Sequence, residues 1–117
     1  MNSELDLTYL EEVTGGSSEM IVETLKLFLN DTPDQLSSLE RNVKNEDWEI
    51  VRAEAHKLKP TFQYVGLSKS HMEIADVETK ARNKEGLESI LQLVQSVQDD
   101  FNLVQSDIKN KIEELSS

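Results

Sequence analysis

The 117-residue chain has no cysteine, only two prolines and only four glycines. Without cysteine it can form neither a disulfide nor a thiolate metal site, and nothing argues for an oxidising compartment. So few glycines and prolines leave too few turn residues for a fold of many short strands. No apolar run approaches the roughly 20 residues of a membrane span, and the N-terminal residues lack the basic and apolar regions of a secretory signal. We therefore expect a helical, soluble, cytoplasmic protein.

Basic side chains are also scarce, with 12 lysines and arginines against 23 acidic residues and a formal net charge of −11. Such a charge repels phosphate backbones and anionic membrane surfaces, so neither nucleic acid nor a membrane is an expected partner. The length fits a single domain over residues 1–117, large enough to bury a core without disulfides or metals. We expect it to act as a monomer.

Apolar residues at helical spacing predict five helices. A short one begins near Leu7 and stops before Gly15, and the second runs from a serine cap at residue 17 or 18 to about residue 43. Pro33 predicts a kink in the second helix near residues 29–33, or a break into two helices. The third spans about residues 48–64, the fourth runs from after residue 68 to about 83, and the fifth runs from about 87 to 115. Short connections favour antiparallel neighbours, so the sequence predicts an all-α, up-down-up-down antiparallel four-helix bundle with the short first helix across one end.

The third predicted helix separates an apolar face from a polar strip that contains a histidine. Its core stripe has the spacing 3, 4, 3, 4, 3 and consists of Trp48, Val51, Ala55, Leu58, Phe62 and Val65. His56 lies roughly 125° from the centre of this stripe, so its ring should point to solvent or to the edge of the bundle. The side chains around it on the helical wheel are Glu49, Arg52, Lys59, Pro60 and Gln63. The fold itself does not require the histidine there.

Apolar side chains also occupy the flank opposite the core stripe, where an isolated bundle has no place for them. They are Ile50, Ala53, Pro60 and Tyr64. Two interpretations stay open: the short first helix covers them, or they form a small docking patch beside His56. Both can hold for different residues.

The stretch Ala55-His56-Lys57-Leu58-Lys59, with Gly66 ten positions after the histidine, resembles the motif of histidine-containing phosphotransfer (HPt) domains. The resemblance extends over most of the chain and includes the order of the five helices. The further residues that match the family are Tyr9-Leu10, Gly16, Phe28, Trp48, Glu78 and Arg82. It implies a phosphoryl carrier in a multistep phosphorelay, with His56 accepting the group from one response-regulator receiver domain and passing it to another.

The resemblance also implies roles for neighbouring residues. Lys59, one turn after His56, would neutralise charge on the phosphoryl oxygens. Gln63, in the same polar strip, is predicted as a further residue of the catalytic site. Glu78 on the next helix would accept the second ring N–H, and Arg82 could hold Glu78 through an i,i+4 pair; an ordinary surface ion pair is the alternative. Arg52 could assist, although no family position supports it. Gly66 is expected in the turn that follows the third helix.

Pro60 is a departure, because the family usually has glycine after this lysine. Proline has no N–H for the carbonyl of His56, so the helix should bend or locally unwind there. The departure and the apolar flank keep a rival hypothesis open, a helical adaptor that binds a receiver-like partner without phosphotransfer. No glycine-rich phosphate loop for ATP is present, so an autonomous kinase is not expected. The two histidines lack the partners of a metal site, so no metal or cofactor is expected, and His71 is assigned no function.

Overall fold

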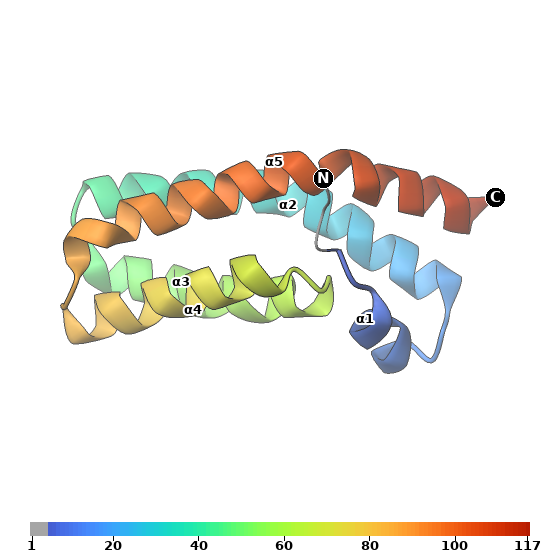
Figure 1. Cartoon of the computed structure of the whole chain (residues 1–117), viewed down its shortest axis with the longest axis horizontal. Helices are drawn as coiled ribbons and strands as arrows, with labels where there is room; N and C mark the ends of the chain where they lie inside the picture. The colour runs from blue at the N-terminus through green and yellow to red at the C-terminus, as the bar shows by residue number, and fades with distance from the viewer. Residues whose placement is uncertain (1–4) are drawn as a thin grey trace.

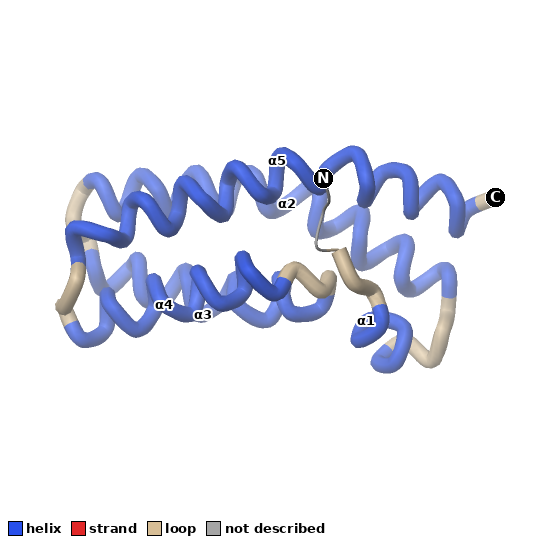
Figure 2. The backbone as a smooth tube through the Cα atoms, viewed as in Figure 1, coloured by secondary structure: helices blue, strands red, loops and turns tan. Residues whose placement is uncertain are grey.

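The computed structural model describes residues 5–117, and all of their regular secondary structure is helical (Figure 2). The elements in chain order are α1 (Thr8–Val13), α2 (Ser18–Lys44), α3 (Trp48–Tyr64), α4 (Ser68–Asn83), a short 3₁₀ helix η1 (Leu87–Ser89) and α5 (Ile90–Ser116). The predicted all-α fold class is confirmed, and the helices begin and end within a few residues of the predicted positions. The fifth one differs most, because its first residues form η1.

The four long helices form an antiparallel bundle in which successive helices run in opposite directions (Figure 1). α2 lies beside α5, and α3 lies beside α4, so the bundle has two layers of two helices. α2 and α5 are longer than α3 and α4, and at one end they project beyond them. α1 lies beside α3 and α4 at this projecting end, below α2 in the view of Figure 1.

A single apolar core lies between the two layers and continues under α1. Ring contacts join three of the four long helices, since Phe28 of α2 meets both Phe62 of α3 and Phe101 of α5 edge to face, with ring centroids 5.2 and 5.3 Å apart. Leu7 and Leu10 bring the N-terminal segment into the same core. Full burial of each such side chain contributes about 1.5–3 kcal/mol, so the fold rests on these contacts.

Both prolines lie inside helices that remain continuous. α2 is one helix from Ser18 to Lys44 with Pro33 within it, so the break that the sequence allowed does not occur. Figure 1 shows α2 bending along its length. α3 is also helical from Trp48 to Tyr64 with Pro60 within it. Of the two predicted alternatives, local unwinding beside His56 is therefore wrong, and a bend at Pro60 stays a prediction.

The turn between α3 and α4 anchors the N-terminal segment. Gly66 has a φ of +71°, as expected for a glycine at a helix end. A Cβ atom at this position would overlap the carbonyl oxygen of Asp6 and lie 2.6 Å from its carbonyl carbon. Asp6 in turn accepts hydrogen bonds from the amide and hydroxyl of Thr8, at 3.0 and 2.7 Å, at the start of α1. The glycine thus allows the chain that leads into α1 to pass close against the α3–α4 turn.

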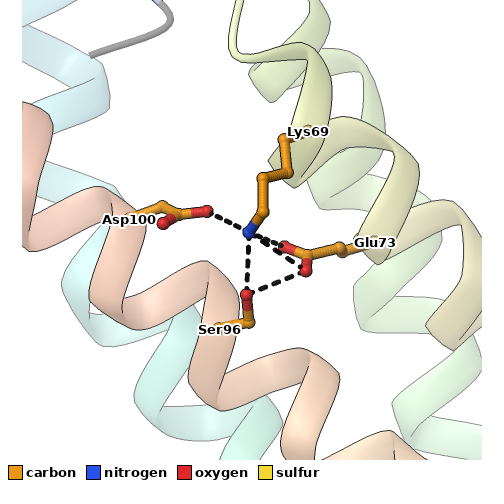
Figure 3. A network of polar contacts seen from close by, with 4 residues as sticks. All are labelled: Lys69, Glu73, Ser96 and Asp100. Carbon is orange, nitrogen blue, oxygen red and sulfur yellow. Dashed lines mark hydrogen bonds and ion pairs between the residues drawn. The ribbon is translucent and has the colours of Figure 1, made fainter. Parts of the chain in front are cut away.

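A polar network fixes the register of α4 against α5 (Figure 3). Lys69 of α4 donates to Asp100 (2.7 Å) and to Ser96 (3.0 Å), both of α5, and Ser96 donates to Glu73 of α4 at 2.8 Å. The hydrogen bond to Asp100 raises the pKa of Lys69 above its ordinary value, against the opposing effect of partial burial. About half of the lysine side chain is exposed, so the network contributes little to stability and more to alignment.

Candidate functional site

His56 projects from the bundle because the opposite face of α3 is committed to the core. The predicted stripe is buried at Val51, Ala55, Leu58, Phe62 and Val65. Trp48 is partly buried and packs against the same core. His56 lies on the other side of the helix with 66% of its side chain exposed. The predicted exposure of the ring is confirmed.

The exposed ring is held by one carboxylate. Nδ1 of His56 lies 2.8 Å from Oε2 of Glu78, which comes from the neighbouring helix α4. An ionised carboxylate only accepts hydrogen bonds, so Nδ1 must carry the proton that is shared with it. In the neutral ring, Nε2 then keeps its lone pair on the side away from Glu78. The contact fixes both the tautomer and the direction of the free nitrogen.

The same carboxylate binds Lys59. The Nζ atom of Lys59 lies 2.7 Å from Oε1 of Glu78, so each carboxylate oxygen has one cationic or N–H partner. Burial raises the pKa of Glu78, but the hydrogen bonds from Lys59 and His56 and the charge of Lys59 outweigh this effect. The pKa therefore lies below the ordinary value of 4.5. Glu78 is ionised at neutral pH although its side chain is only 7% exposed.

The position of Glu78 on α4 explains its burial. It lies within the apolar stripe of that helix, beside Val77 and one turn from Ile74 and Ala81, all of which are buried. A buried charge in such a stripe is stable only when it is paired, and Lys59 and His56 are the partners of the Glu78 carboxylate. This interruption of the stripe is a signal in the sequence from which an interhelical partner could have been inferred, although not which one.

Arg82 does not hold Glu78. Its side chain is exposed, and within residues 5–117 it makes no hydrogen bond or ion pair. The predicted i,i+4 pair between Glu78 and Arg82 is therefore wrong, because burial directs the carboxylate across to α3 instead of along its own helix. Sequence spacing did not reveal the Lys59–Glu78 contact, since these residues are 19 positions apart on different helices.

His56, Glu78 and Lys59 thus form a triad, and the other predicted residues of the polar strip lie outside it. Gln63 is exposed and Arg52 is partly exposed, and neither side chain makes a hydrogen bond in the described part of the chain. His71 is partly exposed near the start of α4 and likewise has no side-chain partner there. Between residues 5 and 117, no group of three or more His, Cys, Asp or Glu side chains could hold a metal ion.

The apolar flank of α3 is divided between the two interpretations that were open. Tyr64 stacks on Tyr9 of α1, with ring centroids 5.6 Å apart, so the short first helix covers part of this residue. All four residues nevertheless remain exposed, Ile50 at 43% and Tyr64 at 42%, together with Ala53 and Pro60. An uncovered apolar surface thus lies next to His56.

Comparison with known proteins identifies one similarity. The family model described as Hpt domain matches residues 23–117, which include α3, α4 and the whole triad. No curated protein and no solved structure matched the chain. Of the helices within residues 5–117, none is long and apolar enough to cross a membrane.

Proposed function

The chain belongs to the Hpt domain family, which carries out histidine phosphotransfer in two-component signalling, and from this we propose that His56 is its phosphorylated residue. Hpt domains interact with the receiver domains of response regulators. In our proposal His56 accepts a phosphoryl group from the aspartyl phosphate of one receiver and passes it to the aspartate of another. The single observation that carries the proposal is the exposed ring whose Nδ1 is held 2.8 Å from the buried Glu78 carboxylate.

The geometry supports Nε2 as the nucleophile. Its lone pair attacks the phosphorus of the aspartyl phosphate, a P–N bond forms, the acyl P–O bond breaks, and the receiver's aspartate leaves as a carboxylate. The ring gives up no proton in this step, because Nδ1 keeps its proton and its hydrogen bond to Glu78. Transfer to the next receiver is the same displacement in reverse. Glu78 touches no reacting atom in this scheme, so it is a positioning residue.

Lys59 has two roles in this proposal. Its ammonium group keeps Glu78 ionised and in place, as the 2.7 Å contact supports. It also has two further N–H donors and is 33% exposed, so it can reach a phosphoryl oxygen while it stays bound to Glu78. Gln63 and Arg52 flank the ring along α3 and are free to contact a docked receiver. Both are proposed as docking residues, which moves Gln63 from the predicted catalytic site to the docking surface.

The charge distribution favours approach to this face. α3 and α4 together carry six basic and five acidic side chains, although the whole chain carries 12 and 23. The excess of negative charge therefore lies on the rest of the molecule. An anionic acyl phosphate meets less repulsion at these helices than the net charge of −11 implies. With Ile50, Ala53 and Pro60 exposed beside the ring, we propose weak, transient docking of a monomer to cytoplasmic receivers.

The proposal is tested by incubating the protein with a panel of phosphorylated receiver domains and measuring its intact mass at neutral and acidic pH. We expect one added phosphoryl group that is lost in acid, because the P–N bond of phosphohistidine is acid-labile. His56→Gln should abolish labelling, and the matched control His71→Gln should leave it intact. Receivers that bind without labelling would instead support the adaptor hypothesis, and labelling of His56→Gln would refute the assignment.

A further inference from the structure

The main-chain carbonyl of His56 has no regular helical partner. In an α-helix this oxygen accepts from the N–H of the residue four positions later, which here is Pro60, a residue without N–H. Within residues 5–117 no side chain donates a hydrogen bond to it either. The residue that presents the reactive nitrogen therefore also presents a carbonyl oxygen that lacks its regular helical donor.

The surroundings of this carbonyl place it on the accessible side of α3. The side chains of His56, Lys57 and Pro60 are all exposed, and they surround this stretch of backbone. The pyrrolidine ring of a helical proline crowds the carbonyl four residues earlier and pushes it away from the helix axis. In the free protein, water can satisfy this oxygen.

A partner that closes over the His56 ring must also cover this oxygen and remove its water. A covered acceptor without a donor weakens a complex on the order of tenfold, whereas a donor in the partner restores the loss. We propose that the cognate receiver donates a hydrogen bond to the carbonyl oxygen of His56, through an amide, ammonium or guanidinium N–H. Pro60 then acts as a specificity determinant, because receivers without a donor at that point are disfavoured. The inference rests on the proposed phosphotransfer function.

Two substitutions at position 60 distinguish the effect of the His56 carbonyl on receiver binding from the effect of the proline ring. Pro60→Ala removes the ring and supplies the missing N–H, so the carbonyl of His56 becomes engaged within the helix. Replacement of Pro60 by lactic acid, the hydroxy-acid analogue of alanine, removes the ring equally but supplies no N–H. Pro33→Ala is the matched control, because it makes the same backbone change in α2. Alanine favours the helix, so all three proteins should fold.

The readout is the apparent KM of phosphoryl transfer from the receiver that labels the wild-type protein most efficiently. We expect a threefold to tenfold higher KM for Pro60→Ala than for the lactic acid protein, which shares the loss of the ring, and a value close to wild type for Pro33→Ala. Equal effects of alanine and lactic acid would show that the ring makes the contact and would overturn the proposal. An unchanged KM for Pro60→Ala would overturn it as well. Failure of the phosphotransfer function itself is distinguishable, because the wild-type protein would then show no labelling.

Discussion

Glu78 and Lys59 should be coupled strongly enough for a double-mutant cycle to detect. Lys59→Met leaves the Glu78 carboxylate, whose side chain is 7% exposed, with His56 as its remaining partner. Removing one member of a fully buried pair costs about 3–5 kcal/mol. Lys59 is 33% exposed, so water reaches the vacated place and screening reduces the cost, and we expect about 2 kcal/mol.

Glu78→Gln should cost about 1–2 kcal/mol, because it exchanges charge-assisted hydrogen bonds for neutral ones while Lys59 turns to water. The double variant has no buried charge to compensate. It should cost about as much as either single variant, which gives a coupling energy of about 1–2 kcal/mol.

The assay is urea denaturation of the four proteins at neutral pH, in which 2 kcal/mol corresponds to a midpoint shift of about 1 M. Lys57→Met is the matched control, since Lys57 is exposed and makes no ion pair in the described part of the chain; its effect should stay within about 0.5 kcal/mol. Additive single effects, or a Lys59→Met cost no larger than that of the control, would refute the reasoning that Lys59 compensates a buried charge.

Three further measurements test other parts of the structure. Because the pKa of Glu78 is depressed in the folded state, its contribution to stability is present above the ordinary value of 4.5 and is lost as pH falls through the lower folded-state value. The stability difference between wild type and Glu78→Gln should therefore be constant near neutral pH and shrink below about pH 4.5; a difference that grows in acid would contradict the depressed pKa. Gly66→Ala should cost at least about 2 kcal/mol more than Gly15→Ala, since both glycines have positive φ but only a Cβ at Gly66 meets backbone; thermal or urea unfolding measures this, and equal costs would argue against the close approach of Asp6. Ile50→Glu should slow phosphoryl transfer while changing stability by about 0.5 kcal/mol or less, because the residue is exposed beside His56; unchanged transfer kinetics would exclude it from the docking surface.

Local patterns in the sequence were sufficient for the helices and for the outward direction of His56. An apolar stripe at helical spacing states which face of a helix is buried, so the opposite face of α3 had to be exposed. Short connections then left few arrangements other than an antiparallel bundle. The continuity of α2 and α3 through their prolines was harder to predict from sequence. Each helix has buried residues before and after its proline, and their packing keeps the helix regular despite one missing hydrogen bond.

The sequence by itself determined the helical class, the apolar core and the exposure of a histidine with a lysine one turn away. Only the tertiary structure decided that Glu78 turns to α3 and bridges His56 and Lys59 instead of pairing with Arg82. It also decided that Tyr9 of α1 stacks on Tyr64, which nevertheless stays as exposed as Ile50. The physical reason is that helical periodicity describes the faces of a single helix. The partner of a buried charge is instead a residue that tertiary packing brings within hydrogen-bonding distance, and this residue can come from any neighbouring helix.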